Sequence, residues 1–439
     1  MAILSPSRPR VIPRPSAGVW PGLFDRRRAP IHAGIARALF RTAVRKLPIT
    51  VSLPDGTRWG SGGPELQIRD DAFFSRLGRD GLIGFGEAYM TGELTTGGWL
   101  PGHDLLDVER INAATDELAA ALTVMAKRMS ILIPQPVQKL RKLWQARPPK
   151  DEENTPDGAK ENIHRHYDLS NELFELFLDP TMTYSSAWYV PGDDHARDLE
   201  KAQLRKIDGV LDLAKVAPGM RILEIGSGWG ALAMRAVAER DVHVTTLTLS
   251  EEQKALAEQR IAAAGMSDRI EVRLEDYRVH AASRPQAYDA VVSVEMIEAV
   301  GEQYWPDYFG AIDRMLTPRG WLGLQAITID HERLLATRNS YTWVHKYVFP
   351  GGILPSLPAI DHVLEQHTDL RMLETRRLGR SYDPTLEQWR HRFNANLPLV
   401  RTEGFDETFI RMWNFYLAYS EAGFASGYLD DWQLGIGRG

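Results

Sequence analysis

The 439-residue chain contains no cysteine, which excludes disulfides, thiolate metal sites and a cysteine nucleophile. No stretch approaches the roughly 18 uninterrupted apolar residues of a membrane-spanning helix. The N-terminus lacks the apolar core of a secretory signal, because proline and arginine interrupt it repeatedly. We expect no metal site, since the pair His164 and His166 stands without an H-E-x-x-H motif. These absences fit a cytoplasmic enzyme better than a secreted, disulfide-linked scaffold.

Positive charge is concentrated at one end of the chain. Residues 1–50 hold ten arginines and lysines and a single acid, Asp25, so this segment carries +9. The whole chain carries −6, and the remainder therefore carries −15. A local positive field on an acidic protein indicates a polyanionic partner that touches one end only. Nucleic acid is disfavoured as that partner, because the body is acidic and no basic, aromatic face accompanies the charge.

Residues 35–47 (IARALFRTAVRKL) have the pattern of a basic amphipathic helix. The helical stripe contains the apolar residues Ile35, Leu39, Phe40, Val44 and Leu47. Arginines at four-residue spacing run beside it. Such a helix can lie in the interface of an anionic membrane, or it can pack as a surface helix on its own domain. Amphipathicity alone leaves both interpretations open.

The composition divides the chain into four parts. Residues 1–34 are predicted to be a flexible basic tail, and 35–146 a smaller mixed α/β, mostly helical, lipid- or membrane-engaging domain. Residues 147–160 combine proline, glycine and dense charge, which is typical of a linker. Residues 161–439 alternate short apolar runs with helical patterns, which predicts an α/β domain with a parallel sheet.

Within these parts the local patterns predict individual elements. A Pro-Asp-Gly turn signal predicts a hairpin over residues 51–59, and apolar periodicity predicts a helix over about 104–132. Five apolar runs are predicted strands: residues 221–225, 242–247, 269–273, 290–294 and 321–325. Helices are expected at 251–264 and 305–315, and an aromatic-rich helical cover at about 387–432.

The first predicted strand ends in a glycine turn, Gly226-Ser-Gly228-Trp-Gly230. Three glycines allow a tight turn and a close backbone approach to a ligand. A dinucleotide site has an acid about 20 residues further on, where threonines such as Thr248 stand instead. An acid before the glycines, Glu224, suits a cationic ligand such as S-adenosylmethionine. We therefore favour a Rossmann-like class I methyltransferase domain over a dehydrogenase.

Several further blocks stand in a fixed order along the chain. They are residues 166–171 (HYDLSN), 178–187 (LDPTMTYSSA), the glycine turn, 247–253 (LTLSEEQ), 295–301 (EMIEAVG) and 346–352 (KYVFPGG). Together these blocks resemble the cyclopropane-fatty-acyl-phospholipid synthase family of S-adenosylmethionine-dependent methyltransferases. Residues 86–92 (GEAYMTG) resemble the N-terminal domain of its longer bacterial members.

The resemblance implies a set of cofactor-binding residues. Tyr184 and Ser185 would hold the methionine end of S-adenosyl-L-methionine, and the glycine turn would approach it through backbone with Glu224 below. Thr248 and Gln253 match positions on the ribose side. The remaining pair, Asp276 and Tyr277, would border the adenine.

The resemblance also implies how the reaction ends. Methyl transfer to an alkene leaves a carbocation on the acyl chain, and in this family a bound bicarbonate removes a proton from it. The positions that match the bicarbonate site are Ser186, Glu298, Gln325, Ile327 (through its backbone) and Tyr382. The block places Glu298 at the catalytic acid, and Glu295 is disfavoured for that role.

Aromatic faces can stabilise such a cation by cation–π contact. The candidates are Tyr304, Trp305, Tyr308, Phe309, Tyr341, Trp343, Tyr347 and Phe349. Core or acyl-tunnel packing is the alternative role for most of them.

Three positions depart from the family pattern. Ser186 replaces a cysteine, Gln325 a histidine, and Ala299 a histidine that commonly follows the catalytic acid. These changes look more like the actinobacterial branch that converts oleoyl chains to 10-methylene chains, for which a separate reductase makes the 10-methyl group. A cyclopropane synthase, and more distantly a non-catalytic lipid-binding module, remain alternatives. The resemblance further implies a homo-oligomer, peripheral on the inner face of the membrane, acting on phospholipid acyl chains.

Overall fold

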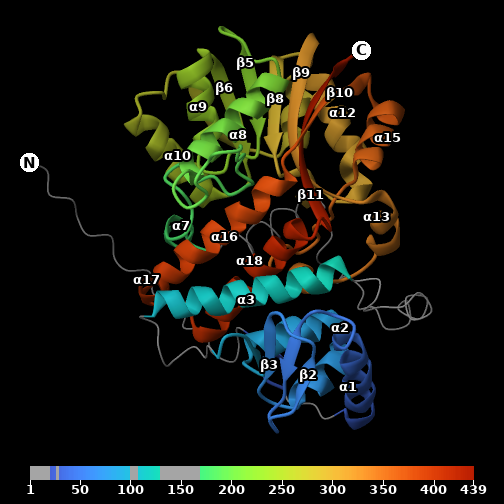
Figure 1. Ribbon diagram of the computed structural model, residues 1–439. Coiled ribbons are helices and arrows are strands. Elements are labelled where there is room, and N and C mark those ends of the chain that lie inside the picture. The colour runs from blue at the N-terminus through green and yellow to red at the C-terminus, as the bar shows by residue number, and fades with distance from the viewer. Residues whose placement is uncertain (1–19, 26–28, 99–106, 129–168) are drawn as a thin grey trace, which may run out of the picture.

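The structure is a computed structural model that describes residues 20–25, 29–98, 107–128 and 169–439. The predicted linker, as well as His164 and His166, lies outside the described residues. Figure 1 shows three layers: a sheet with helices on both faces, a middle layer of long helices, and a smaller N-terminal part. No helix of the described residues is long and apolar enough to cross a membrane.

The upper layer is built on a seven-stranded sheet. Its strands are β5 (Arg221–Ile225), β6 (His243–Thr248), β7 (Ile270–Leu274), β8 (Tyr288–Val294), β9 (Leu316–Ile329), β10 (Leu370–Arg377) and β11 (Leu429–Arg438). Their order is β10-β11-β9-β8-β5-β6-β7, and β11 runs antiparallel to both of its neighbours. The five strands predicted from apolar runs form the parallel part, so the predicted Rossmann-like α/β fold is confirmed.

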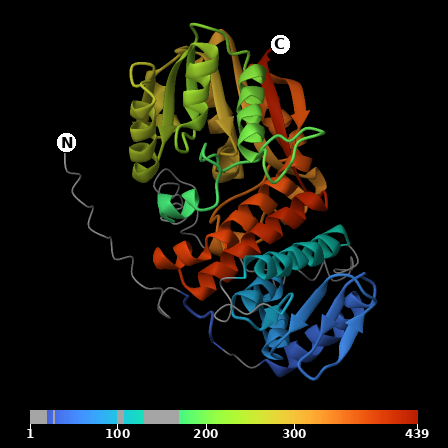
Figure 2. The ribbon, with the colours of Figure 1, turned by 60° about the vertical axis from the view of Figure 1, so that its left-hand side comes forward.

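Helices pack on the two faces of this sheet (Figure 2). They are α8 (Leu199–Leu213), α9 (Ala231–Arg240), α10 (Glu251–Ala263), α11 (Tyr277–Ser283), α12 (Trp305–Met315) and α15 (Leu357–His367), with 3₁₀ turns at Ile297–Ala299 and Glu302–Tyr304. Three short helices lie off the sheet: α7 (Asn171–Glu175) below it, α13 (His331–Thr337) beside α15, and α14 (Trp343–Tyr347) against the N-terminal part. The lengths and apolar faces of α10 and α12 follow the predicted patterns.

The middle layer contains α3 (Val108–Lys127), α16 (Gly379–Ala395), α17 (Leu397–Thr402) and α18 (Glu407–Ala425). The buried guanidinium of Arg390 joins two parts of this layer, since it donates to Asp116 of α3 at 2.7 Å and to Glu421 of α18 at 2.8 Å. The predicted helical cover is wrong at its end, where β11 begins at Leu429. Strand β11 completes the sheet beside β9, and this long-range pairing leaves no mark in the local aromatic pattern.

The N-terminal part contains α1 (Pro30–Val44), β1 (Thr50–Ser52), β2 (Arg58–Gly60), β3 (Glu65–Ile68), α2 (Ala72–Met90) and β4 (Leu94–Thr95). Strands β1 and β2 pair antiparallel with Val51 opposite Trp59, as the turn signal predicts. The predicted flexible tail does not extend to residue 34. Helix α1 begins at Pro30, whose fixed φ suits a first helical turn, and Leu23 is buried with its carbonyl bound by Arg76.

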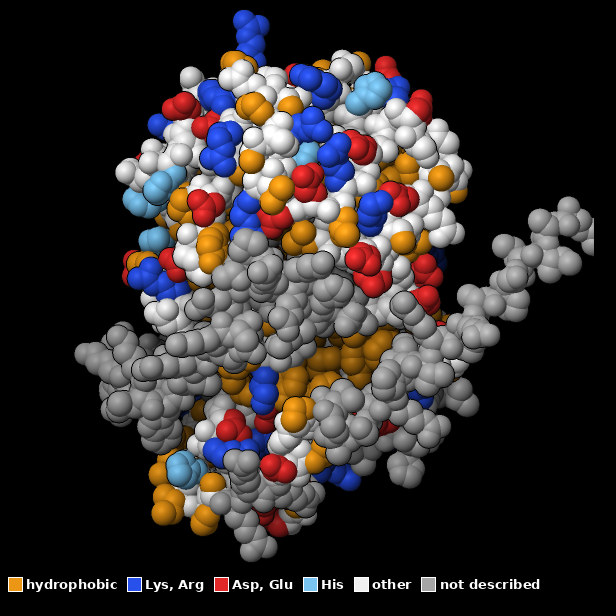
Figure 3. Space-filling view, turned by 180° about the vertical axis from the view of Figure 1, so that it is seen from behind, with side chains coloured by type: hydrophobic (Ala, Val, Ile, Leu, Met, Phe, Trp, Pro, Cys, Tyr) orange, Lys and Arg blue, Asp and Glu red, His pale blue; other side chains and the backbone are white. Residues whose placement is uncertain are grey.

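The apolar stripe predicted along residues 35–47 divides between two faces of α1. Phe40 and Val44 enter the core of the N-terminal part. Ile31, Ile35 and Leu39 follow each other at four-residue spacing and are 75%, 49% and 58% exposed. Figure 3 shows hydrophobic side chains at the outer end of this part of the molecule. Helix α1 therefore has one apolar face in the core and a second one open to its surroundings.

Glu87 of α2 connects the N-terminal part to the loop that carries α14. Its carboxylate accepts hydrogen bonds from Arg76 at 3.1 Å, from Lys346 at 2.6 Å and from the Tyr347 hydroxyl at 2.8 Å. The neighbouring Gly86 lies against the indole of Trp343, so that a Cβ there would lie 2.5 Å from a ring carbon. The start of the block at residues 86–92 thus packs against α14, whose last two residues begin the block at 346–352.

We expect Gly86→Ala to destabilise the protein by about 1–3 kcal/mol, because the added methyl overpacks a tight helix-to-loop contact. Urea unfolding followed by tryptophan fluorescence measures the change. Gly34→Ala is the matched control, since Gly34 lies in α1 with open space around its Cβ position and ordinary helical backbone. The control should be neutral or slightly stabilising. Equal stability of Gly86→Ala and wild type would show that this contact adapts freely.

Candidate functional site

The predicted glycine turn joins β5 to α9 and adopts a conformation that side chains rarely permit. Gly226, Gly228 and Gly230 have φ values of 96°, 47° and 84°. The backbone N–H groups of Gly226 and Ser227 donate to the carbonyl of Leu247 at the end of β6. A Cβ at Gly228 would meet no atom of the described residues within 4 Å. At Gly228 the turn therefore presents bare backbone, at the carboxyl end of the sheet.

Glu224, two residues before this turn, is 3% exposed, and its Oε2 has no hydrogen-bond partner among the described residues. Burial raises the pKa of Glu224 to about 8, although the charge of Lys206 opposes the shift. An orphaned carboxyl oxygen beside an open backbone cradle fits a ligand that carries positive charge. The turn and Glu224 thus fit S-adenosylmethionine, whose amine and sulfonium are cationic.

The other predicted cofactor residues lie at neighbouring strand ends. Thr248 ends β6, and its hydroxyl donates to the Gln253 side chain at 2.9 Å. Asp276 caps α11 and binds Arg278 with both carboxylate oxygens, at 2.8 and 2.6 Å. Tyr277 packs edge-on against Tyr308, with ring centroids 5.4 Å apart.

Tyr184 and Ser185 lie on the segment that precedes α8. The Tyr184 hydroxyl is 2.8 Å from that of Tyr416 in α18, and the Ser185 hydroxyl accepts from the ammonium of Lys206. The structure therefore joins this segment to both the helical layer and α8. Tyr416 and Lys206 were not predicted.

A polar cluster lies where β8 ends, and its centre is the carboxylate of Glu295. Oε1 accepts from the backbone N–H of Ser186 and from Gln325 Nε2, both at 2.8 Å. Oε2 accepts from the Tyr382 hydroxyl at 2.6 Å. Burial raises the pKa of Glu295, whereas Lys206 and the three donors oppose the rise. The structure thus brings Ser186, Gln325 and Tyr382 together around the acid that the sequence argument disfavoured.

Backbone strain marks the same residue. Glu295 has φ = 49°, a left-handed conformation that costs a non-glycine residue on the order of 1 kcal/mol or more. Such outliers persist where surrounding contacts over-determine them, and they cluster at functional sites. The three hydrogen bonds to its carboxylate are contacts of this kind.

Glu298 lies one 3₁₀ turn further on. Its Oε1 accepts from the backbone N–H of Ile327 at 2.6 Å, and its Oε2 is inaccessible to solvent with no partner among the described residues. Burial and the nearby charge of Glu295 raise the pKa of Glu298 to about 8. Near neutral pH, Glu298 is therefore mostly protonated. Its neighbour Glu295 accepts three hydrogen bonds from the protein.

The donors expected to hold a bicarbonate have other partners in this cluster. Three of the groups that would bind it, from Ser186, Gln325 and Tyr382, donate to Glu295, and the Ile327 N–H donates to Glu298. The hydroxyl of Ser186 donates to the carbonyl of Ala187 instead. Carboxylates of the chain itself thus accept the hydrogen bonds that the resemblance assigns to an ion.

Further buried polar groups hold the Gln325 side chain of this cluster in place. Gln325 donates to Asp431 at 2.9 Å and accepts from Gln433 at 3.1 Å. Gln433 also donates to the backbone carbonyl of Lys206 at 2.8 Å. One signal for Lys206 was available in the sequence: it lies three residues after Gln203 and four before Val210, on the buried face of α8. Nothing local distinguished Asp431 or Gln433.

The predicted aromatic residues divide between two roles. Trp305, Tyr308 and Phe309 are buried in the core beneath the sheet. Phe349 instead lies edge-on to Tyr416, with ring centroids 5.8 Å apart, beside the predicted cofactor segment. Figure 3 shows hydrophobic side chains gathered at the waist between the upper and lower parts.

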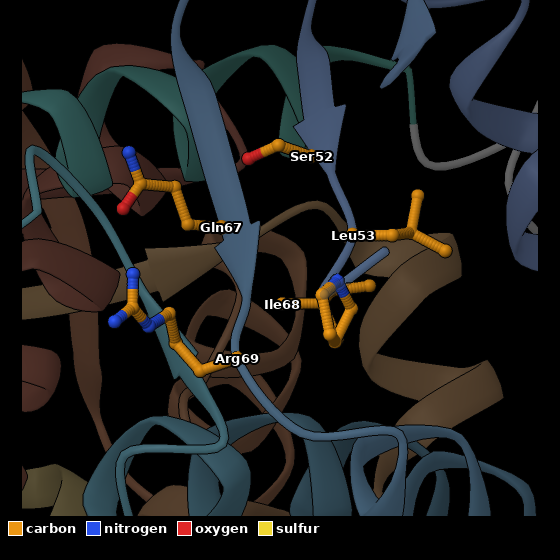
Figure 4. Close-up of a pocket in the computed structure, with 6 residues that line it drawn as sticks. Ser52, Leu53, Gln67, Ile68 and Arg69 are labelled. Atoms are coloured by element: carbon orange, nitrogen blue, oxygen red, sulfur yellow. The ribbon is translucent and has the colours of Figure 1, made fainter. Parts of the chain in front are cut away.

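A surface pocket in the N-terminal part is separate from this site (Figure 4). Its lining residues are Ser52, Leu53, Pro54, Gln67, Ile68 and Arg69. Arg69 is its one titratable side chain, and no acid faces it from the lining. The pocket has no group suited to proton removal, and the polar cluster remains the candidate active site.

Comparison with known proteins identifies a family and several relatives. The family model described as mycolic acid cyclopropane synthetase matches residues 154–434. The tuberculostearic acid methyltransferase UfaA1 of Mycobacterium tuberculosis is 44% identical over 95% of this chain and 96% of its own. The cyclopropane-fatty-acyl-phospholipid synthase of Escherichia coli K12 is 31% identical over 87% of this chain and 89% of its own.

Solved structures show the same fold. The mycolic acid cyclopropane synthase CmaA1, solved with SAH and CTAB, superposes with a TM-score of 0.57 at 31% identity. The match covers 63% of this chain and 97% of that one.

We expect the raised pKa of Glu298 to make stability fall as pH rises. Between pH 4.5 and about 8 the folded state holds a proton that the unfolded state has lost, so the free energy of unfolding decreases by up to about 1.4 kcal/mol per pH unit. Glu298→Gln removes this contribution and should flatten the slope of stability between pH 6 and 8. Urea unfolding across that range checks it, with the exposed Glu200→Gln as control. An unchanged slope in Glu298→Gln would contradict the assignment.

Proposed function

This chain belongs to the mycolic acid cyclopropane synthetase family and is an S-adenosylmethionine-dependent fatty acyl methyltransferase, and on that premise we propose its substrate and product. The substrate is the cis double bond of an oleoyl chain carried by a membrane phospholipid. The product is the 10-methylene chain. The observation that carries the proposal is the Glu295 carboxylate, which receives the donors expected to hold a bicarbonate.

Bound S-adenosylmethionine supplies an electrophilic methyl group, and methylation of C10 of the alkene leaves a carbocation at C9. The proton that leaves cannot be the one on C10, because its loss would give an internal alkene. The hydride on C10 moves to C9 and places the cation at C10. Glu295 then takes a proton from the new methyl group, whose C–H electrons form the exocyclic C=CH₂ bond. Tyr382 and Gln325 hold this carboxylate while it accepts the proton.

The environment of Glu295 favours the methylene over the ring. Ring closure requires that the methyl lose its proton while the cation is still at C9. Three hydrogen bonds hold both oxygens of Glu295 and oppose part of the rise in pKa that burial causes. A carboxylate held in one place in this way accepts the proton only where the methyl group reaches it, and we propose that this follows the hydride shift. The name of the 44% identical relative, tuberculostearic acid methyltransferase, supports the same branch.

Product analysis tests the proposal directly. We expect incubation with S-adenosylmethionine and dioleoyl phospholipid vesicles to add one carbon and to give vinylidene protons in the proton NMR spectrum of the released fatty esters. Mass alone is insufficient, because the methylene and cyclopropane products are isomers. High-field ring protons would identify a cyclopropane synthase instead. No one-carbon gain would point to another acyl acceptor or to a non-catalytic lipid-binding module.

Glu295→Gln is the companion variant in this assay. It keeps the size of the side chain and should lower turnover by on the order of 10²–10⁴, the usual contribution of a positioned base. Cofactor binding, measured by calorimetry, should be unchanged because the glycine turn and Glu224 are intact. The control Glu200→Gln should be fully active. Full turnover by Glu295→Gln would remove Glu295 from the mechanism.

We further propose that α1 carries the protein to the inner face of an anionic membrane. Its exposed apolar residues Ile31, Ile35 and Leu39 can enter the headgroup boundary, and the basic N-terminal segment supplies long-range attraction. Arg37 and Arg41 contribute to that attraction while their guanidinium groups lie over Trp59. A reductase acting on the methylene product is the proposed partner, and homo-oligomerisation is proposed from the family resemblance alone.

The double variant Ile35→Glu, Leu39→Glu should lower binding to vesicles that contain anionic phospholipid by at least tenfold, because it places two carboxylates on the docking face. Wild-type binding should weaken as salt rises. Cosedimentation measures both effects. The matched control, Val279→Glu with Leu373→Glu, changes exposed apolar residues of the catalytic part and should bind normally. Salt-insensitive binding, or equal loss in the control, would contradict docking through α1.

A further inference from the structure

Lys206 is a lysine of α8 whose side chain is fully enclosed, with 1% of the residue exposed. Its ammonium donates to the Ser185 hydroxyl, and its own backbone carbonyl accepts from Gln433. Burial lowers the pKa of Lys206 to about 8, but nearby acids oppose the shift, so the ammonium is mostly charged near neutral pH. A buried cation is costly unless negative charge compensates it.

The charge of Lys206 interacts with four acids, each from a different segment. They are Glu295 after β8, Asp431 of β11, Asp179 before α8 and Glu224 of β5. One ammonium balances one carboxylate, so the site cannot hold Glu295, Asp431 and Glu224 all ionised at low cost. The question is which acid carries the negative charge.

The hydrogen-bond donors around each acid indicate which one is ionised, because an ionised carboxylate in a dry site needs such donors. Glu295 accepts from three donors with both oxygens. Asp431 accepts from Gln325 on one oxygen, and its Oδ1 has no partner among the described residues. Glu224 Oε2 and Asp179 Oδ1 likewise have no partner there. The protein solvates Glu295 as an anion better than it does the other three.

We infer that Lys206 is a positioning residue for the reaction: it is the buried counter-charge that keeps Glu295 ionised and able to accept the proton, while Asp431 stays protonated. This inference rests on the proposed role of Glu295 as base. It also assigns Gln325 a second function. Its one amide group donates to both Glu295 and Asp431, and so it holds the charged and the neutral acid apart.

The test is the pH dependence of kcat. Activity should fall at low pH as Glu295 becomes protonated. Lys206→Met removes the counter-charge and should move this acid limb upward by about one pH unit or more, with activity recovering at higher pH. A merely structural role would lower kcat equally at every pH. Lys201→Met is the matched control, because Lys201 lies on the same helix with its side chain 60% exposed, and its profile should match wild type.

Asp431→Asn is the second variant and is nearly isosteric, so it keeps the fold if Lys206→Met does not. If Asp431 is protonated, asparagine preserves its charge and the acid limb should stay within about 0.3 pH units of wild type. A larger shift would mean that Asp431 is the ionised partner of Lys206, which overturns the inference. An unshifted limb in folded Lys206→Met would overturn it as well.

Glu295→Gln distinguishes a failure of the proposed base from a failure of the proposed role of Lys206. If Glu295→Gln keeps full turnover, the proposed base is wrong and the inference falls with it. If Glu295→Gln is inactive but Lys206→Met has a wild-type pH profile, only the inference about Lys206 fails.

Discussion

The site depends on one constraint: a carboxylate removed from water must receive its hydrogen bonds from the protein. The donors to Glu295 come from a loop before α8, from β9 and from α16. Two of them, Ser186 and Gln325, are more than 100 residues apart in the chain. They meet because the parallel sheet brings β8 and β9 side by side and the helical layer closes over their carboxyl ends (Figure 1). Sheet, loop and cover each supply one donor, so the loss of any one layer would leave the anion partly unsolvated.

The N-terminal part extends this dependence to the outer surface. Glu87 binds Lys346 and Tyr347, and the loop that they belong to returns so that the Ile353 N–H donates to the backbone carbonyl of Glu298. A continuous series of packed contacts therefore runs from α2, which packs against α1, to Glu298 and its neighbour Glu295. If α1 docks on a bilayer, the same contacts fix the height of the active site above it.

Much of the fold could be predicted from the sequence, because local pattern determines it. Apolar runs bounded by turn residues identify the five parallel strands, and the glycine turn identifies the cofactor end of the sheet. Strand β11 was missed because its pairing with β9 is set by tertiary contact rather than by alternation. The block alignment selects Ser186, Gln325 and Tyr382, which the structure brings together, but it does not show which carboxylate they bind. It leads to Glu298, whereas the side chain of Glu295, on a left-handed backbone, accepts from all three. Neither a φ value nor a convergence of donors can be seen in one sequence.

The buried acids of the site lower the stability of the protein. Glu224, Glu298 and Asp431 each have a buried carboxyl oxygen without a partner among the described residues, and burial raises the pKa of all three. Protonated acids are tolerable in a dry interior, whereas four ionised ones are not, and a single ammonium sets the limit. If Glu295 is the base, as proposed, neutral acids around one ionised acid give a site that is dry enough to protect a carbocation from water and still contains a base. A better-packed apolar interior would be more stable, but it would leave the cation with no group to take its proton.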